Sequence, residues 1–317
     1  FSENGSVFLT DGAIRRTLAA TRSMSREGVR VTCGEATRAN ITFWSRFCGV
    51  KLKYPSPRKH TEAFVSTLVS YLTENPHDCL LPMEQDTLDV ILSRRSEFEN
   101  VTRLPFVDNP TYRVFRDKGE TMKLAEKIGI PHPRTVWPQD VTNLAKEVAD
   151  LKFPLIVKPR GNWSSRGVQV ARDQAELEKV FADIHADFPF PLVQEKIPPG
   201  GEQFHVCCLM DEDSKLKAVC TQRELRHFPH FEGMGSSTAQ ESVDRPDLVD
   251  LTVKILQANN WRGVANADIM IDPRDGTPML IEINPRLWGP LQASINAGVN
   301  FPYLLYRQAL GQKVEPM

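Results

Sequence analysis

The chain has 317 residues, enough for two or three folded units, and its 41% hydrophobic and 25% charged residues are usual for a soluble globular enzyme. Its 39 basic and 40 acidic residues leave a formal net charge of −1, so the composition excludes the basic footprint of a nucleic-acid-binding protein. No apolar run approaches the roughly 18–20 residues of a membrane span, so we expect no membrane contact.

The six cysteines form no CxxC pair and have no zinc-like Cys/His spacing. Cysteines without a disulfide framework are typical of a reducing compartment. The first residues, FSENGSVFLT, also lack the charged and then apolar pattern of a secretion signal. We therefore expect a cytoplasmic protein.

The first hundred residues predict alternating strands and helices. A strand over 6–10, a helix over 13–26 and a strand over 29–33 make a β-α-β unit, which implies a parallel sheet. Further along we expect a short helix over 41–47, a helix over 61–74, a strand over 79–83 and a helix over 84–95. The GxGxxG fingerprint of a dinucleotide site is absent.

Two acids follow the predicted strand over 79–83. Ligands of open α/β sheets bind at the carboxyl ends of the strands, so Glu84 and Asp86 are candidates for a substrate site. The alternative is that both acids favour the N-terminus of the helix that follows. The second explanation is the commoner one.

The middle of the chain predicts a charged helix over 111–129, a helix over 141–151 and a strand over 153–160. The strand ends with Lys158, and an ammonium group inside an apolar strand is costly unless an anion neutralises it. The loop after it, residues 161–171, contains Ser164, Ser165 and Gly167, and such a loop either closes over phosphate groups or is an ordinary surface turn.

After a helix over 173–187, strands over 191–197, 202–210 and 216–225 predict a second, antiparallel sheet. The polar residues 231–242 predict a mobile loop. Arg223, Arg226 and His227 precede that loop, and they indicate either a site for a carboxylate or a basic surface turn. A helix over 246–259 follows, and helices over 291–297 and 301–311 end the chain.

The most informative stretch is ANADIMIDPRDGTPMLIEINPRLWG, residues 265–289, which predicts two strands joined by a DPRDG turn. Glu282 and Asn284 share one face because side chains alternate along a strand, and a hairpin brings Asp268 beside them. Two carboxylates and an amide suit Mg²⁺, and Arg286 on the same side suggests an anionic ligand. A surface hairpin is the alternative, but the flanking isoleucines indicate burial.

Lys158 in PLIVKP, the small-residue loop, VQEKI, and then Asp268 with IEINPR follow one another in the order found in the ATP-grasp superfamily. The chain resembles a carbamoyl-phosphate-synthase-like ATP-grasp enzyme of the carboxylate–amine ligase kind. The resemblance implies an α/β and α+β fold, with a Rossmann-like N-terminal domain before a two-lobed ATP-grasp. It places the Rossmann-like domain at residues 1–105, the first lobe at 106–195 and the second lobe at 196–317.

The resemblance also implies roles for single residues. Lys118 and Lys158 resemble the lysines that contact ATP phosphates, and the loop with Ser164, Ser165 and Gly167 resembles the flap over them. The family's flap is usually richer in glycine than NWSSRG. The ATP-binding candidates in the segment that joins the lobes and just after it are Gln194, Glu195 and Ile197 for the adenine and Glu202 for the ribose.

At the other end of the ATP site, Asp268, Glu282 and Asn284 resemble the ligands of two Mg²⁺ ions, with Mn²⁺ as an alternative. Asp268 stands where many family members have Glu. Arg286 resembles the arginine that faces the transferred phosphate, and Lys158, Arg286 and Arg223 are the catalytic candidates.

These roles imply ATP-dependent activation of a small carboxylate as an acyl phosphate, which an amine then attacks. One alternative is a carbamoyl-phosphate-type phosphotransfer enzyme, and another is a non-catalytic ATP-binding regulator. We expect small-molecule substrates, no nucleic acid and, by default, a homodimer.

Overall fold

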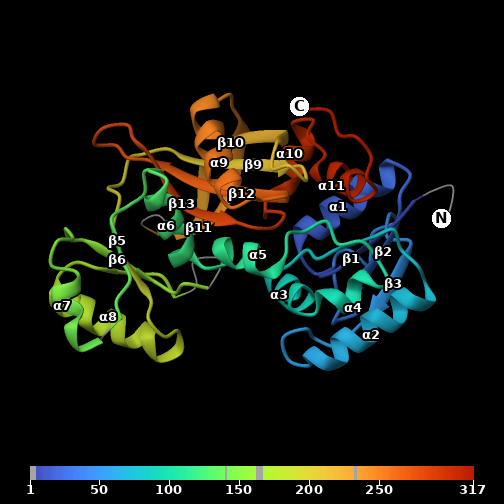
Figure 1. The fold of residues 1–317 in the computed structure, drawn as a ribbon, viewed down its shortest axis with the longest axis horizontal. Helices are drawn as coiled ribbons and strands as arrows, with labels where there is room; N and C mark the ends of the chain where they lie inside the picture. Colours follow the sequence, from blue (N-terminus) through green and yellow to red (C-terminus); the bar gives the residue numbers. More distant parts are fainter. Residues whose placement is uncertain (1–4, 140, 162–166, 232–233) are drawn as a thin grey trace.

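The computed structural model describes residues 5–139, 141–161, 167–231 and 234–317. Three sheets organise the chain, and Figure 1 shows them as three regions: an N-terminal domain at the right, a small lobe at the left and a large sheet above and between them.

The N-terminal domain contains a four-stranded parallel sheet in the order β3-β2-β1-β4. Its strands are β1 (Ser6–Leu9), β2 (Arg30–Glu35), β3 (Val50–Lys53) and β4 (Cys79–Leu81). Its helices are α1 (Arg15–Arg26), α2 (Thr61–Glu74), α3 (Gln85–Ser93) and α4 (Arg95–Glu99). The prediction of a Rossmann-like parallel sheet is confirmed.

One element of this domain was predicted wrongly. Residues 41–47 form turns and no helix, and Asn40 organises their start by accepting a hydrogen bond from the Phe43 backbone N–H (2.9 Å). An asparagine side chain that bonds the backbone two or three residues on favours a turn over a helix. The short strand β3 follows and was not predicted.

The small lobe is a four-stranded antiparallel sheet in the order β5-β8-β6-β7. Its strands are β5 (Thr135–Val136), β6 (Leu155–Lys158), β7 (Gln169–Ala171) and β8 (Leu192–Glu195). The helix α8 (Gln174–Asp187) packs on this sheet. The helix predicted over 141–151 is much shorter: a 3₁₀ turn (Val141–Asn143) leads into α7 (Leu144–Glu147).

The charged helix predicted over 111–129 is two helices, α5 (Asn109–Arg116) and α6 (Lys118–Lys127). The break falls at Asp117, whose backbone is extended (φ −99°, ψ 112°) and whose carboxylate accepts from the N–H groups of Gly119 and Glu120. An aspartate in this role is a strong helix N-cap, so it restarts the helix in a new direction. Both helices pack against β13 of the large sheet.

The large sheet has five antiparallel strands in the order β11-β10-β9-β12-β13. The strands are β9 (Gln203–Met210), β10 (Leu216–Phe231), β11 (Met234–Ser242), β12 (Gly263–Ile271) and β13 (Pro278–Asn284). The prediction of a loop over 231–242 is therefore wrong, because β11 is a strand that pairs with β10. β11 is an edge strand of the sheet, and edge strands commonly contain polar residues.

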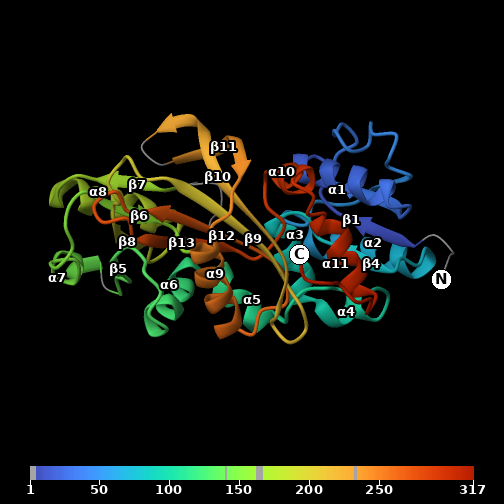
Figure 2. The ribbon, with the colours of Figure 1, turned by 90° about the horizontal axis from the view of Figure 1, so that it is seen from above.

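The helices of the C-terminal part are α9 (Pro246–Ala258), α10 (Leu291–Asn296) and α11 (Phe301–Ala309). α10 and α11 pack against α1 of the N-terminal domain, as Figure 2 shows from above. No helix in the described ranges is long and apolar enough to cross a membrane.

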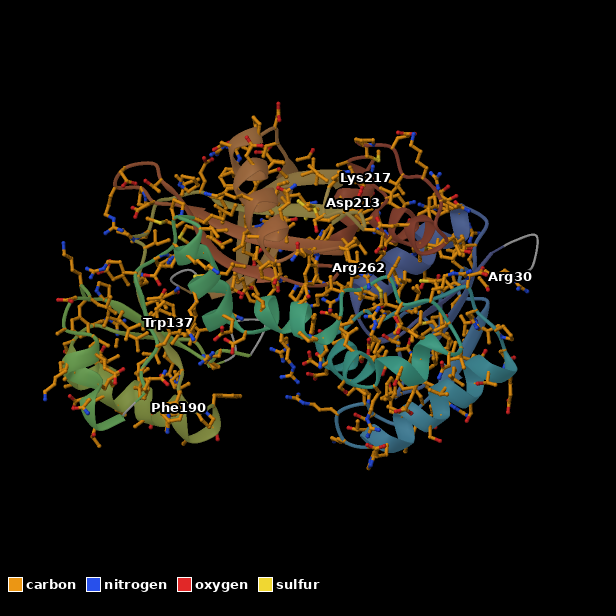
Figure 3. The ribbon with its side chains drawn as sticks, in the orientation of Figure 1. Arg30, Trp137, Phe190, Asp213, Lys217 and Arg262 are labelled. Atoms are coloured by element: carbon orange, nitrogen blue, oxygen red, sulfur yellow. The ribbon has the colours of Figure 1, made fainter. Side chains whose placement is uncertain are left out.

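The N-terminal domain and the large sheet share one apolar core, which includes Val7 and Leu9 of β1 as well as Trp261 before β12 and Leu305 of α11. The small lobe has a separate core. Arg262, labelled in Figure 3, adds a polar link: it donates to the Glu212 carboxylate (2.7 Å) and to the backbone carbonyl of Phe106 (3.3 Å). The N-terminal domain is thus a fixed wall for the cavity beside the large sheet.

Candidate active site

A cavity of about 970 Å³ lies between the small lobe and the large sheet. Strands β6, β7 and β8 supply one wall, strands β9 to β13 supply the other, and α1 and α10 contribute residues as well. Apolar residues on both walls leave room for a flat ring between them: Ile156, Val168, Val170, Ile197, Ile269 and Ile281. A mostly apolar cavity with a few convergent polar groups is the usual form of a small-molecule site.

The predicted hairpin is present, and it brings the three metal candidates together. Asp268 is the direct register partner of Glu282, and a register shift follows it. The Asn284 amide donates from Nδ2 to Asp268 Oδ2 (3.0 Å) and to Glu282 Oε1 (3.1 Å). The prediction that these side chains lie side by side is therefore confirmed in the geometry.

Two lysines approach this carboxylate cluster from the other lobe and from α6. Lys118 Nζ lies 2.9 Å from Glu282 Oε2. Lys158 is only 5% exposed, and burial together with the charge of Lys118 lowers its pKa to about 8. Burial alone would raise the pKa of Glu282, but Lys118 and Lys158 outweigh it and hold that pKa at about 2.

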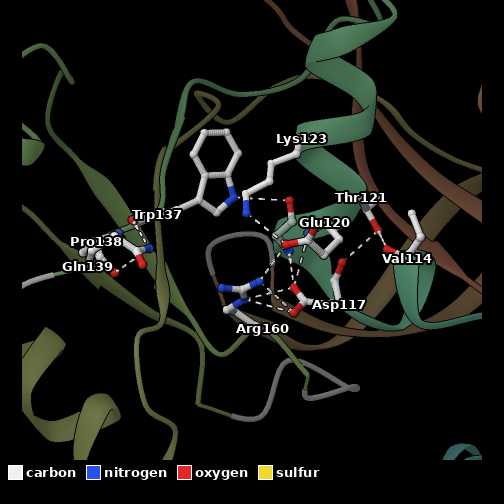
Figure 4. A network of polar contacts seen from close by, with 10 residues as sticks. Val114, Asp117, Glu120, Thr121, Lys123, Trp137, Pro138, Gln139 and Arg160 are labelled. Carbon is white, nitrogen blue, oxygen red and sulfur yellow. Dashed lines mark hydrogen bonds and ion pairs between the residues drawn. The ribbon is translucent and has the colours of Figure 1, made fainter. Parts of the chain in front are cut away.

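Next to Lys118 in the chain, Asp117 and Glu120 form ion pairs with Arg160 (Figure 4). Arg160, just after β6, donates from Nε to both Asp117 oxygens (3.0 Å each) and pairs with Glu120 (3.1 Å). The backbone N–H of Lys118 also donates to the Arg160 carbonyl (3.0 Å). Because Arg160 is two residues beyond Lys158, the network fixes both lysines relative to each other.

The structure adds two residues that the sequence analysis missed. His205 on β9 is the register partner of Asp268 and contacts its Oδ1 through Nδ1 (2.6 Å), while its Nε2 lies 3.3 Å from Glu224. Burial lowers the pKa of His205, but the two carboxylates outweigh it and raise that pKa to about 10. Asn266 donates to Asp268 Oδ1 (2.7 Å).

Strand alternation could have found Asn266, since it stands two residues before Asp268 and therefore shares its face. It could also have placed Gln203 and His205 on one face of β9. The pairing of β9 with β12 was the missing information, because no local signal shows which strands are neighbours.

The oxygen donors fit a magnesium ion. Over residues 5–139, 141–161, 167–231 and 234–317, no group of three or more His, Cys, Asp or Glu side chains is placed to hold a metal alone. Asp268 and Glu282 offer two carboxylates, and a half-turn of the Asn284 amide would present its oxygen instead of its nitrogen. Mg²⁺ in triphosphate sites is commonly held by one or two carboxylates, phosphate oxygens and water, which matches this donor set.

Arg286 extends the site toward the N-terminal domain. Its side chain is 7% exposed and donates to the Gln85 side-chain oxygen on α3 (Nε, 3.1 Å), to the Asn284 side-chain oxygen (3.3 Å) and to the Leu287 carbonyl (3.0 Å). Gln85 in turn donates to the hydroxyl of Tyr112, which donates to Asp89 (2.6 Å). A residue 201 positions away in the chain therefore sets the orientation of Arg286.

The predicted adenine-binding segment lines the cavity at Gln194, Glu195, Lys196 and Ile197. The Gln194 side chain is buried and donates to Thr135 (2.7 Å), and the Glu195 carboxylate accepts from the backbone N–H of Lys152 (3.0 Å). The side chains of Gln194 and Glu195 are thus engaged within the small lobe, which leaves their main-chain groups as the candidates for contacts with a base.

The predicted flap is described at its two ends only. Ser164 and Ser165 lie outside the described residues. Gly167 has a φ of +76°, a left-handed conformation that glycine adopts without strain, and Pro159 would clash with a side chain there. The role of this loop stays a prediction.

Among the described residues, several predicted site residues do not line the cavity. Arg223 donates to the Glu241 carboxylate and to Glu202 (2.7 Å), and its side chain is 39% exposed. Glu202 is exposed in the same ion pair. Arg226 is exposed too, and the side chain of His227 lies outside the described residues. Glu84 caps α3 and pairs with Arg16 (2.7 Å), and Asp86 follows in the first turn, which favours the helix explanation for both.

The chain is similar to known proteins in sequence and in fold. Residues 188–317 match the family model described as ATP-grasp in the biosynthetic pathway with Ter operon. The chain is 22% identical over 243 residues to the D-aspartate ligase of Enterococcus faecium, which covers 70% of the chain and 58% of that protein. It is 27% identical over 173 residues to the D-alanine–D-alanine ligase of Pseudomonas entomophila, which covers 53% and 54%.

Among solved structures, biotin carboxylase from Campylobacter jejuni superposes with a TM-score of 0.81 at 13% identity, over 97% of this chain and 71% of that one. This likeness shows the shared fold. The chain spans little more than half the length of the two curated relatives. The ordered motifs resemble those of the ATP-grasp superfamily, residues 188–317 match an ATP-grasp family model, and the fold is shared with biotin carboxylase.

Proposed function

We propose that this protein is an ATP- and Mg²⁺-dependent ligase that joins a small carboxylate to an amine and releases ADP and phosphate. The observation that carries the proposal is the buried Lys158, which lines the cavity beside Lys118 and Glu282. An ammonium in such a position needs an anion, and a triphosphate supplies one. The two relatives named above are both ligases by name, which supports the same reaction class.

In the proposed reaction the substrate carboxylate attacks the γ-phosphorus of ATP, which breaks the bond to ADP and forms an acyl phosphate. The amine then attacks the acyl carbon, and phosphate leaves. Lys158 and Arg286 stabilise the negative charge that spreads over the phosphoryl oxygens. Lys158 can do so at neutral pH because its pKa of about 8 keeps most of it protonated.

Asp268, Glu282 and Asn284 would hold Mg²⁺, one or two ions, with Mn²⁺ as a substitute. When bound, the metal neutralises phosphate charge and aligns the terminal phosphate. His205 and Asn266 fix the Asp268 carboxylate from the sides through its Oδ1, so that Oδ2 faces the Asn284 amide. Lys118 on α6 holds the Glu282 carboxylate by an ion pair to its Oε2.

We place the adenine between the apolar walls of the cavity, with the main chain of Glu195 and Ile197 as its hydrogen-bonding edge. Glu202 reaches the ribose in this proposal only if its ion pair with Arg223 opens. The reaction uses ATP inside cells, so we also propose a cytoplasmic setting. The six cysteines are free and buried, as in that setting. Self-association into a homodimer stays part of the proposal.

The test is release of ADP from ATP and Mg²⁺ across a panel of small acids and amines. Lys158→Ala and Glu282→Gln should each lower turnover by roughly 10²–10⁴-fold, because each removes charge that the transition state needs. Lys152→Ala, an exposed lysine near the same lobe, is the matched control and should leave turnover unchanged. Circular dichroism checks that all variants stay folded.

Product analysis separates the alternatives. An amide together with ADP and phosphate supports ligation, whereas a retained acyl phosphate supports the carbamoyl-phosphate-type reaction. Full activity in both site variants, or nucleotide binding without ADP release across the whole panel, would refute the proposed ligase.

A further inference from the structure

One part of the cavity has more polar groups than the ATP site accounts for. We name it the α1–α10 part, and its residues are Arg15 and Arg16 of α1, Gln292 and Ala293 of α10, and Ser237 and Gln240 of β11. The contacts of α10 with both α1 and β11 join these three elements.

Among the described residues, several buried polar atoms in this part have no hydrogen-bond partner. They are the hydroxyl of Ser237 and both polar atoms of the Gln240 amide. Buried polar atoms almost always have a partner, and each one without a partner costs free energy. Three such atoms along one stretch of a cavity indicate that a polar ligand forms the missing hydrogen bonds.

The charges here indicate the sign of that ligand. Arg16 is 8% exposed and Arg286 is 7% exposed, and both line the cavity. Two buried guanidinium groups near each other are unfavourable without anions. Glu84 lies 2.7 Å from Arg16 Nη2 and offsets one of these charges.

Arg15 adds a third guanidinium. It is exposed, it lines the cavity, and no ion pair to it occurs among the described residues. Glu84 offsets the charge of Arg16, and the charges of Glu282 and Asp268 act on Arg286. Nearby, Glu224 is paired with His205. A substrate whose single carboxylate lies near Arg286 would leave Arg15 without an anion.

We propose that the α1–α10 part of the cavity binds an acid substrate with a second anionic group, either a carboxylate or a phosphate, and that Arg15 and Arg16 are its ligands. The inference rests on the proposed ligase function, since it assigns a substrate class to the same cavity. The reacting carboxylate lies near Arg286, and the second anion lies toward α1. Gln240 and Ser237 hydrogen-bond the polar atoms between the two groups.

The test compares acids that differ only in the charge of the second group: aspartate with asparagine, glutamate with glutamine, and phosphoserine with serine. Each is assayed for ADP release with ATP, Mg²⁺ and an amine panel, and for direct binding by calorimetry. We expect at least tenfold higher kcat/KM, and tighter binding, for the charged member of one pair. The pair that shows this preference tells whether the second anionic group is a carboxylate or a phosphate.

The main variants change exposed residues, so that folding is not in question. Arg15→Glu reverses an exposed charge and should abolish the preference, mainly through KM, whereas Arg15→Lys should keep part of it. Arg22→Glu is the matched control, because Arg22 is exposed on the same helix and does not line the cavity. Arg16→Met removes the second proposed ligand, which is buried, and its result is interpreted only if circular dichroism shows a native fold.

Equal use and equal binding of charged and neutral acids would overturn the substrate class, and so would equal effects of Arg15→Glu and Arg22→Glu. Failure of the ligase proposal is a different result: no acid then releases ADP, yet calorimetry still shows whether Arg15 favours the charged member of a pair. Calorimetry without such a preference overturns the inference even then.

Discussion

Arg286 and Arg223 were both catalytic candidates from the sequence, and the structure gives them opposite surroundings. Arg286 is buried, lines the cavity, and is held by neutral groups, the side chains of Gln85 and Asn284. Arg223 is 39% exposed and contacts the carboxylates of Glu202 and Glu241.

The difference lies in what neutralises each cation. Two carboxylates already offset the charge of Arg223, so an anionic substrate gains little from it. Arg286 has oriented donors and no carboxylate among its hydrogen-bond partners, so its charge is available to a phosphoryl or acyl oxygen. Burial and the nature of the partner, more than charge in the sequence, decide which arginine can act.

The largest effect that follows from this comparison is that of Arg286→Ala. We expect kcat/KM for ADP release to fall by roughly 10²–10³-fold, since a preorganised donor to the transition state is lost. Steady-state kinetics on the best substrates of the panel measure it. Arg286→Lys keeps the charge without the fork of donors and should recover only part of the loss. Unchanged kinetics for Arg286→Ala would contradict the conclusion that Arg286, unlike Arg223, acts on the reacting groups.

A smaller loss of kcat/KM is expected when the hydrogen bond from Arg286 to Gln85 is removed. Gln85→Leu deletes one hydrogen bond to a charged group, worth about 1.5–3 kcal/mol, which corresponds to roughly 10–100-fold if it acts wholly in the transition state. The decrease should appear in kcat more than in the KM for ATP, because Gln85 does not line the cavity. Gln85→Glu keeps an acceptor for Arg286 but adds a carboxylate that offsets its charge, so it should not rescue the activity. A loss in Gln85→Leu that follows its melting temperature alone would indicate a merely structural residue.

The third effect concerns pH and tests the other buried cation, Lys158. Its pKa of about 8 lies below the ordinary lysine value because of burial and Lys118, so its ammonium is present below pH 8 and lost above it. Bound phosphates favour the ammonium, and ADP affinity should therefore fall about tenfold between pH 7 and pH 9. Calorimetry with ADP measures this, and adenosine, which has no phosphate, is the control that should not change. Equal pH dependence for both ligands would contradict the placement of Lys158 at the phosphates.

The sequence predicted those parts of the site that depend on local pattern. Alternation along β13 put Glu282 and Asn284 on one face, and the turn after Ile271 brought Asp268 opposite to them. Lys158 was recognised because an ammonium at the end of an apolar strand is unusual. The parallel N-terminal sheet followed from its β-α-β pattern, and the fold class is confirmed.

The parts that were missed depend on contacts between distant segments. His205 meets Asp268 only because β9 pairs with β12, and Gln85 meets Arg286 only because the N-terminal domain packs beside the large sheet. The basic cluster around Arg223 was misjudged for a related reason. Residues 231–242 were expected to form a loop, whereas β11 pairs with β10 and places Glu241 against Arg223.

The smallest effect is expected for Arg223→Ala. Exposed ion pairs contribute about 0–1 kcal/mol, so the melting temperature should change by no more than a few degrees, and kcat/KM should stay within about twofold of the parent. Glu241→Gln is the informative partner variant, because it removes the contact that offsets Arg223 while leaving the arginine in place. If Arg223 contacts substrate after all, Arg223→Ala will lower kcat/KM at least tenfold and Glu241→Gln will raise substrate affinity. That pair of results would show that the arginine exchanges its carboxylate partners for the substrate during turnover.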